Sequence, residues 1–423
     1  MGLSSTLYTG ISGLKSNSEA MSVTGNNISN SNTVGFKSSA TLFSDVLSAS
    51  ISSASGSSQV GRGVQISTVS TSFSQGSFQS TSSSTDLAIE GDGFFMVSAA
   101  DSEEVLYSRN GSFSFDSDGY LTNAEGYLVQ GKIYDENGDL VGGDATDIRV
   151  DFDSQIPAHQ SESLTLTTNL DSSSDIITAF DITNPDDTSN YSTSTQIYDS
   201  LGDTHLVTTY FTKTADQTWE WHMTADSSEL DSSIAGLDDL TEIATGTLTF
   251  DSSGNLLSGA TATTAVGDII WTNGSDATQQ IEMTFDTTQF SSSSIVISQS
   301  QDGYAPGEVV DVSIDDSGTV AASYSNGETI DIAMLTLATF INPGGLSKQG
   351  GSLYVANSAS GSASVGTAGA SQGAIYTSSL ELSNVDLAQE FVNLITIQNG
   401  YSASSKVITT TDEMLQELIN LKR

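Results

Sequence analysis

Apolar residues recur every seven positions at both ends of this 423-residue chain, and this spacing constrains the fold more than any other feature of the sequence. A seven-residue repeat is typical of a helix that packs along its length against another helix. We therefore predict helices over residues 1–28 and 380–423 that pair as a coiled-coil-like core. The predicted packing residues are Leu7, Leu14, Met21, Ile28, Leu380, Leu387, Phe391, Leu394, Tyr401, Ile408 and Leu415.

Two interpretations of these helices are open at this point. They are either ordinary amphipathic helices on a globular core, or a pair whose remaining apolar surface faces other subunits. Gly10, Gly13 and Gly25 weaken the first helix, so it needs a partner to be stable. Pairing of the two ends buries only part of stripes this long, which favours the second interpretation.

The chain between the helices has the pattern of a β-rich protein with many turns. A turn pattern recurs at Asp116–Gly119, Asp135–Gly138, Asp251–Gly254 and Asp315–Gly318. The Asp carboxylate can accept backbone N–H groups just ahead of it, and Gly can take the positive φ that ends the turn. The pattern therefore predicts β-hairpins. Calcium binding is the alternative, but DENG lacks the Glu that an EF-hand loop has six residues after its Gly.

The predicted fold class is mainly β with α-helical termini. Strands are predicted within residues 86–97, 208–212, 247–250 and 330–337, and the spacing of Trp219 and Trp221 is typical of a half-buried sheet. Stretches rich in Ser, Ala, Thr and Gly, at residues 48–58, 79–85 and 358–372, predict linkers or surface loops.

The net charge limits the kinds of partner that this chain can bind. There are 11 Lys plus Arg against 52 Asp plus Glu, which gives a formal net charge of −41. Phosphate contacts need cationic side chains, and an anionic membrane surface would repel the chain, so we expect neither nucleic acid nor membrane as a partner. Self-association should depend on salt, because like-charged copies must approach one another.

Residues typical of catalytic and metal sites are sparse. The chain has no Cys, which excludes thiol catalysis and zinc–thiolate sites. His159, His205 and His222 lack metal-ligand spacing, and no dinucleotide fingerprint is present. We expect no enzymatic activity, no metal and no cofactor.

The sequence also bears on export. The first twenty residues have no basic region followed by an apolar core, and no segment reaches the roughly 18 apolar residues of a membrane helix. We therefore expect an exported form of the chain to leave the cell without a cleaved signal peptide.

Two terminal segments resemble a known family. Residues 25–37, GNNISNSNTVGFK, resemble the N-terminal signature of bacterial flagellar rod and hook proteins, which runs close to NNIANxNTxGFK. Residues 383–395, SNVDLAQEFVNLI, are similar to the C-terminal signature of the same family. At Asn399 the family usually has Arg, so no role of that Arg is carried over. The matching residues are Asn26, Asn27, Asn30, Asn32, Thr33, Gly35, Phe36, Lys37, Ser383, Asn384, Val385 and Asp386.

Segments in the middle of the chain resemble hook proteins more than rod proteins. They cover residues 198–203, 301–307, 324–329 and 340–346. The resemblance implies nested domains, each formed from both halves of the chain. These are a terminal helical core at residues 1–28 and 380–423, an extended connector at 29–70, an inner β domain at 71–150 and 296–370, and an inserted outer β domain at 151–295.

The resemblance implies a structural subunit of the flagellar hook that passes through a type III export channel. Outside the cell it would self-assemble into a curved, flexible tube that transmits torque from rod to filament. The implied partners are further copies of the chain, the distal rod protein, the hook cap, the hook–filament junction protein and the export apparatus. A distal rod or other flagellar axial protein is one alternative. A secreted acidic adhesin or carbohydrate-binding protein is another, with Trp219, Trp221 and Trp271 as its contacts.

Overall fold

A computed structural model describes residues 2–47, 49–53, 56–100, 102, 104–135, 138–236, 238–369 and 372–421. The chain forms two compact units. Unit 1 comprises Met1–Asp151, Asp311–Ala322 and Thr329–Arg423, and unit 2 comprises Phe152–Val310 and Ser323–Glu328. Unit 1 is therefore built from both ends of the chain, and unit 2 from the middle.

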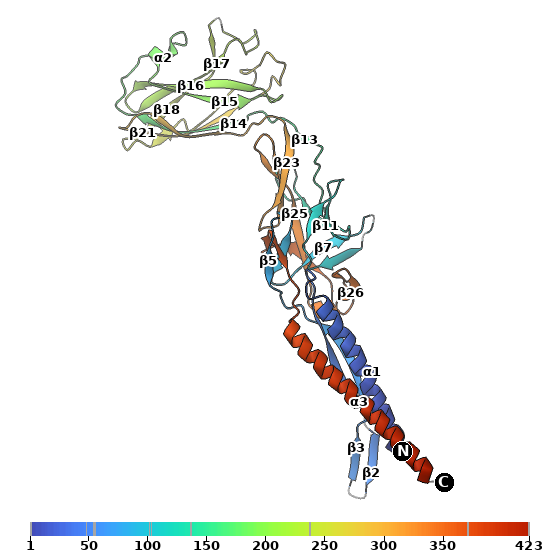
Figure 1. The fold of residues 1–423 in the computed structure, drawn as a ribbon. Coiled ribbons are helices and arrows are strands. Elements are labelled where there is room, and N and C mark those ends of the chain that lie inside the picture. The colour runs from blue at the N-terminus through green and yellow to red at the C-terminus, as the bar shows by residue number, and fades with distance from the viewer. Residues whose placement is uncertain are drawn as a thin grey trace. The chain divides into compact units, whose positions relative to one another are not determined.

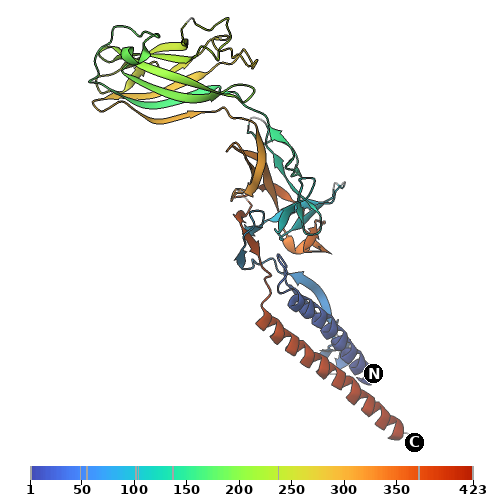
Figure 2. The same cartoon turned by 45° about the horizontal axis from the view of Figure 1, so that its top comes forward.

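The two ends of the chain form a helix pair in unit 1. Helix α1 (Gly2–Ser29) and helix α3 (Leu387–Leu421) lie side by side, as two views of the ribbon show (Figures 1 and 2). The predicted fold class, mainly β with paired helical termini, is confirmed. Among the described residues, no helix is both long and apolar enough to span a membrane.

The prediction that the C-terminal helix begins at residue 380 is wrong. Leu380 lies in strand β30 (Ser379–Glu381), which pairs antiparallel with β5 (Phe78–Ser80). Helix α3 begins seven residues later, where the carboxylate of Asp386 accepts the N–H groups of Ala388 and Gln389 at 2.9 and 3.2 Å. Leu380 lies seven residues before Leu387 by coincidence, because an apolar residue of a neighbouring strand can have the same spacing as a helical repeat.

Residues 29–70, predicted as an extended connector, contain paired strands. Strand β1 (Ser39–Asp45) pairs antiparallel with β4 (Val64–Thr71), and β2 (Ala49–Ser53) pairs with β3 (Gly56–Val60). Strands β1 and β4 both contact α1. The described part of the predicted linker 48–58 therefore forms a hairpin, while residues 48, 54 and 55 lie outside the described residues.

The β part of unit 1 is a sheet with shorter strands attached to it. Its strand order is β24 (Thr319–Tyr324), β25 (Thr329–Thr339), β11 (Leu128–Ile133), β7 (Phe94–Ser98), β8 (Val105–Ser108), β27 (Leu353–Val355) and β26 (Ser347–Gly350). The attached strands are β9 (Phe113–Phe115), β10 (Leu121–Asn123), β12 (Thr146–Asp147) and β28 (Ser364–Thr367). Strand β6 (Leu87–Glu90) pairs with β29 (Ala374–Thr377), β23 (Gly307–Ile314) precedes β24, and a short 3₁₀ helix covers Pro343–Gly345.

Aromatic side chains fill one core of this sheet. Phe94 packs edge-on against Phe340 and Tyr354, and Tyr107 packs edge-on against Phe340. Part of the predicted linker 358–372 is ordered by the sheet, because β28 pairs with β25. Residues 370 and 371 lie outside the described residues.

Unit 2 is a sandwich of two sheets. One sheet has the order β15 (Tyr191–Tyr198), β16 (Thr204–Ala215), β17 (Thr218–Asp226), β18 (Leu240–Phe250) and β19 (Leu256–Ser258). The other has the order β20 (Thr261–Thr263), β21 (Glu282–Phe290), β14 (Ser163–Asp171) and β22 (Ile295–Gln301), with β14 and β21 parallel. Strand β13 (Gln155–Ile156) and helix α2 (Pro185–Thr188) complete the unit. Residues 296–310 belong to this unit and not to the inner domain to which we assigned them, since β22 pairs with β14 and the boundary of the unit falls at Val310, within β23.

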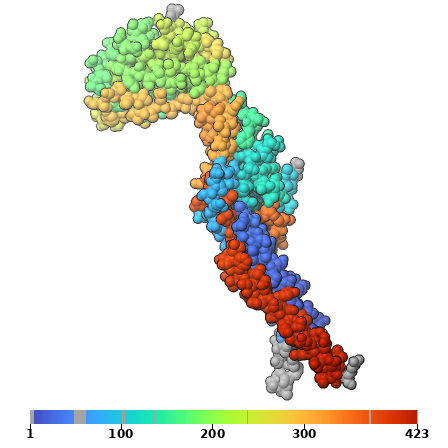
Figure 3. All heavy atoms as spheres, viewed as in Figure 1, coloured from blue at the N-terminus to red at the C-terminus, as the bar shows by residue number. Residues whose placement is uncertain are grey.

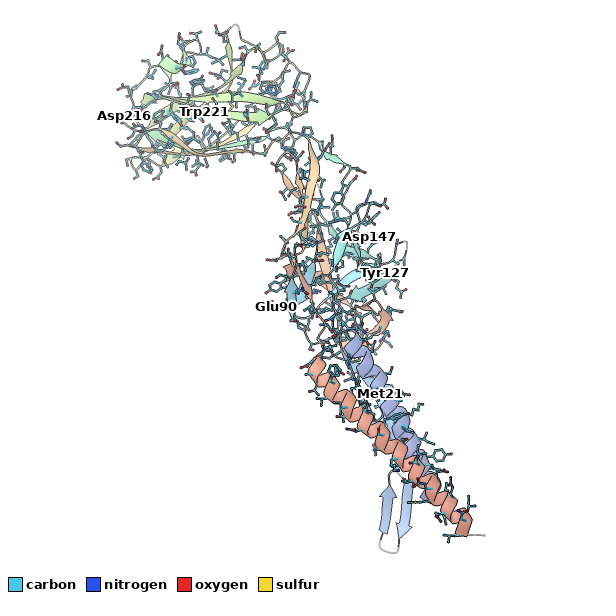
Figure 4. All side chains as sticks on the ribbon, viewed as in Figure 1. Met21, Glu90, Tyr127, Asp147, Asp216 and Trp221 are labelled. Carbon is cyan, nitrogen blue, oxygen red and sulfur yellow. The ribbon has the colours of Figure 1, made fainter. Side chains whose placement is uncertain are left out.

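The core of unit 2 lies between the two sheets. Trp219 and Trp221 on β17 pack in one cluster with Leu166 on β14 and Phe285 on β21. Both tryptophans point into the sandwich, where Figure 4 labels Trp221, and their exposed fractions are 0% and 1%. Their interpretation as sheet packing is therefore confirmed.

The four predicted Asp-to-Gly turns are present. In each, the glycine N–H donates to the backbone carbonyl of the aspartate three residues earlier, at 2.9–3.2 Å. The glycines Gly119, Gly138, Gly254 and Gly318 have φ values of +82°, +78°, +84° and +83°. The four predicted strand segments also lie within strands: β6 and β7, β16, β18, and β25.

Candidate subunit interface

Helices α1 and α3 run antiparallel and meet through small residues. Asn27 Nδ2 donates to Glu390 Oε1 at 3.2 Å towards one end of the pair, and Gly10 lies against Ile408 towards the other. A Cβ added to Gly13 would lie only 2.6 Å from Ser404 Oγ. Gly10 and Gly13 therefore allow the close approach of α1 to α3, whereas a Cβ added to Gly25 would meet nothing within 4 Å.

The predicted packing residues lie mostly beside this contact. Figure 4 labels one of them, Met21, on α1. Those that are partly buried are Leu7, Leu14, Met21, Ile28, Leu394, Ile408 and Leu415, and those that are exposed are Leu387, Phe391 and Tyr401. Leu380 is on a strand, as described above. The role of these residues in packing against other subunits stays a prediction.

Large apolar side chains remain exposed along both helices. Helix α3, red in the space-filling view of Figure 3, lies on an open face of unit 1. Its exposed apolar residues are Leu387, Phe391, Val392, Ile395, Tyr401, Val407, Met414, Leu418, Ile419 and Leu421, and those of α1 are Tyr8 and Ile11. Exposed apolar side chains in this number favour an interaction site on the helix pair, because water disfavours their exposure.

The two family-like signatures meet in unit 1 and are joined by hydrogen bonds. Asn384 accepts the N–H of Ser38 through Oδ1 at 2.8 Å and donates through Nδ2 to the carbonyls of Ser72 and Ser74. Gly35 donates its N–H to the carbonyl of Glu381 at 2.8 Å. These contacts connect the end of α1 to the segment that leads into α3.

Gly35 and Asn27 have roles that explain their residue types. Gly35 has φ of +67°, and a Cβ there would lie 2.6 Å from the backbone nitrogen of Asn110, so a larger residue does not fit. The Asn27 amide bridges two elements, since it donates to the carbonyl of Ser39 at 2.7 Å and accepts the N–H of Ser39 at 3.0 Å. It therefore fixes the first residue of β1 against α1.

A buried ion cluster lies beneath this junction. Lys37 Nζ is 2.6 Å from Glu381 Oε1, and both side chains are fully buried. Arg109 Nη1 is 3.6 Å from Glu381 Oε2, and the Gly76 N–H donates to Glu381 Oε1 at 2.8 Å. Lys37 Nζ also donates to the carbonyl of Ser74 at 2.9 Å. The Glu381 carboxylate, just before α3, therefore connects Lys37 of the N-terminal signature with Gly76 and Arg109 of the β part of unit 1.

Burial shifts the pKa values of Lys37, Arg109 and Tyr354 in and beside this cluster. Loss of hydration lowers the pKa of Lys37, against the opposing effect of its hydrogen bond to Glu381. Burial likewise lowers the pKa of Arg109, and it raises the pKa of the neighbouring Tyr354 hydroxyl well above its usual range. Sequence reasoning named Lys37 but missed Glu381 and Arg109, because no local spacing connects positions 37, 109 and 381.

The other signature residues lie nearer the surface. Asn26 and Asn30 share a side-chain hydrogen bond of 3.1 Å, and Thr33 Oγ1 donates to Asn30 Oδ1 at 3.1 Å. Lys348 Nζ lies 5.4 Å from the centre of the Phe36 ring. Asn32 is exposed, Ser383 and Val385 are partly buried just before α3, and Asp386 caps that helix.

The residues named for other kinds of site have structural contacts in unit 2. The exposed fractions of Trp219, Trp221 and Trp271 are 0%, 1% and 2%, so none of them is available as a surface contact for a carbohydrate. His205 stacks on Trp271 and lies 2.8 Å from Glu229 Oε2. His159 stacks on Tyr304, and His222 stacks on Phe180. In the described ranges, no three His, Asp or Glu side chains gather as a metal-binding group.

Four family models match successive parts of the chain. "Flagella basal body rod protein" matches residues 7–37, and "Flagellar hook protein FlgE/F/G D1 domain" matches residues 88–169. "Flagellar basal body protein FlaE D2 domain" matches residues 167–304, and "Flagellar basal body rod FlgEFG protein C-terminal" matches residues 376–421. The chain therefore has the segments of an axial protein of the bacterial flagellum.

Curated relatives match over almost the full length. The flagellar hook protein FlgE of Borreliella burgdorferi is 33% identical, with 98% of this chain and 99% of that protein covered. The flagellar hook protein FlgE of Escherichia coli is 34% identical, with 97% and 98% covered. The crystal structure of the Helicobacter pylori flagellar hook protein FlgE2 has a similar fold, with a TM-score of 0.50 at 16% identity over 71% of this chain and all of that one.

The chain belongs to the flagellar hook protein family. Members of this family are structural subunits of the flagellum, and this chain is a hook subunit.

Proposed function

We propose that copies of this chain assemble, through their terminal helices, into the tube of the flagellar hook outside the cell. The observation that carries the proposal is the apolar surface that α1 and α3 leave exposed while they contact each other through small residues. Burial of that surface between copies stabilises an assembly by roughly 25 cal/mol per Å² before the costs of association. A single copy cannot cover it.

The proposal also assigns a role to each part of the molecule. The helices would form the contact that orders the tube, and the β units would make looser contacts that slide as the tube bends. The implied neighbours are the distal rod protein, the hook cap and the hook–filament junction protein, and the export apparatus would deliver the chain. The strong negative charge supports a dependence of assembly on salt, since screening lowers the repulsion between copies.

The experiment is negative-stain electron microscopy and sedimentation of the full chain and of the variant Leu387→Asp/Leu394→Asp, each at low and high salt. The wild-type protein should form tubes or short filaments. The variant should remain monomeric, because two charges would have to be buried at each contact.

The matched control carries the same two charges in unit 2. Ile295→Asp/Ile297→Asp changes two exposed apolar residues on the edge strand β22, and it should still assemble. Normal tubes from the helix variant, or loss of assembly only in the control, would contradict the proposal.

A further inference from the structure

The end of helix α3 extends beyond the start of α1. Contacts along the antiparallel pair join Asn27 to Glu390, Asn17 to Gly400 and Gly10 to Ile408, so the position on α3 rises as the position on α1 falls. At the same rise per residue in both helices, Gly2 lies opposite about residue 416. The last turn of α3 therefore extends beyond the described part of α1.

This end of α3 carries an apolar face flanked by carboxylates, which we name the acidic–apolar face. It consists of Glu413, Met414, Glu417, Leu418 and Leu421, which share one side of the helix at 3.6 residues per turn. These residues line one shallow groove. Leu418 and Leu421 have exposed fractions of 52% and 81%.

The outer side of α1 carries a face of the opposite charge, which we name the basic–apolar face. It consists of Tyr8, Ile11 and Lys15, which lie three and four residues apart on one side of the helix. Tyr8 and Ile11 have exposed fractions of 72% and 53%, and the Lys15 side chain is 77% exposed. The ion pair of Lys15 with Glu19 is 4.0 Å long and exposed, so it holds Lys15 weakly.

Resting on the self-assembly proposed above, we propose that the basic–apolar face of one copy docks on the acidic–apolar face of the next copy. Each face joins large apolar side chains to charge, and the two charges are opposite. Exposed cations are scarce in a chain with 11 Lys plus Arg, so a cation beside exposed Tyr and Ile selects an acidic, apolar partner. The end of α3 is such a partner.

A second copy is the occupant that fits both faces at once. Each copy offers one face of each kind, so a contact between two copies leaves one basic and one acidic face free. This contact is heterologous and repeats into an open helical chain, which is what a filament subunit requires.

The test uses charge reversal in the full chain. Lys15→Glu should raise the protein concentration needed for assembly by about tenfold, and so should Glu413→Lys/Glu417→Lys, because each variant sets like charges against one another. Lys132→Glu changes the net charge of the chain as Lys15→Glu does, but lies on β11, and should assemble like the wild type. The helical circular dichroism of all variants should be unchanged, because the altered side chains point away from the contact between α1 and α3.

Mixing identifies the pairing. An equimolar mixture of Lys15→Glu and Glu413→Lys/Glu417→Lys should assemble at a concentration within about twofold of the wild type, because each variant then offers the face that the other needs. The triple variant in one chain should assemble equally well. Restoration in neither experiment would overturn the pairing.

The outcome for the single variants separates this inference from the proposed function. If wild-type tubes form and Lys15→Glu forms them equally well, the pairing is wrong and the role of the helices in assembly stands. If the wild-type protein forms no polymer at any salt concentration, the proposed function fails and the pairing fails with it.

Discussion

The sandwich of unit 2 and the helix pair of unit 1 bury their apolar residues in opposite ways. In unit 2 the largest side chains, Trp219, Trp221 and Trp271, lie in one closed cluster between two sheets. In the helix pair, Gly10 and Gly13 make close contacts with α3, while large residues along α3 stay exposed. Unit 2 therefore has a core of its own, whereas the helix pair leaves large apolar side chains exposed.

The two units also differ in the number and exposure of their Lys and Arg residues. Lys213 is the only Lys or Arg of unit 2, and it is buried, where Nζ donates to the carbonyls of Ser172 and Ser174. Lys15 and Lys406, by contrast, are exposed on the helices of unit 1. In the assembly proposed above, copies of unit 2 would repel each other, and we expect unit 1 to supply the attraction that opposes this repulsion.

The largest expected effect on either unit follows from removing a core tryptophan. Trp219→Ala should lower the free energy of unfolding of unit 2 by about 3–5 kcal/mol, because it deletes a fully buried indole and leaves a cavity. All three tryptophans lie in unit 2, so the fluorescence of Trp221 and Trp271 reports its unfolding alone. The helical circular dichroism should melt as in the wild type, and Leu257→Ala, an exposed position in the same unit, should change neither signal. Loss of both signals together would mean that the units unfold as one.

The buried ion cluster gives the reciprocal test in unit 1. Glu381→Gln should lower the stability of unit 1 by about 3 kcal/mol, because Lys37 and Arg109 then lose their buried counter-charge while the Gln oxygen still accepts the Gly76 N–H. The helical signal should melt earlier, with tryptophan fluorescence unchanged. The matched control is Glu90→Gln, at the surface residue labelled in Figure 4, which should shift melting little. Equal shifts in the two variants would contradict a structural role for the cluster.

The two units should also differ in their stability towards acid, and we expect this difference to be smaller than the two effects above. In unit 2, hydrogen bonds from Ser228 and Ser233 lower the pKa of Asp226 and Asp231, and those from Asn255 lower the pKa of Asp251. A carboxyl whose pKa is lower in the folded protein than its ordinary value of 3.8 stabilises the fold at pH values above 3.8. This stabilisation is lost as the pH falls through the pKa of the folded protein. In unit 1, burial would raise the pKa of Asp315, but hydrogen bonds from Ser317 and Thr319 lower it overall. Burial raises the pKa of Glu125, whose stability contribution has the opposite sign, because it is present at low pH and lost as pH rises.

Tryptophan fluorescence should therefore change at a higher pH than the helical signal when the protein is titrated below pH 3.8. The control is Asp251→Asn/Asp231→Asn, which removes two of the titrating groups and should narrow the difference. Loss of the helical signal before the fluorescence changes would reverse the predicted order.

Local patterns predicted much of the fold. The four Asp-to-Gly turns, the strand segments and the presence of a helix at each end agree with the predictions, because each depends on a few neighbouring residues. The start of α3 was wrong by seven residues, since Leu380 continued a spacing that the strand pairing of β30 overrides. The assignment of residues 296–310 failed for a related reason, because nothing near Ile295 indicates that β22 pairs with β14.

The sequence by itself determined the class of protein, because heptad spacing, turn chemistry, charge and the two signatures are all local or additive properties of the chain. The tertiary structure alone decided which residues meet. It paired the helices through Gly10 and Gly13, brought Lys37, Arg109 and Glu381 into one buried cluster, and placed the end of α3 beyond the described part of α1. Such contacts join positions far apart in the chain and depend on how side chains fill space, and no local periodicity specifies that.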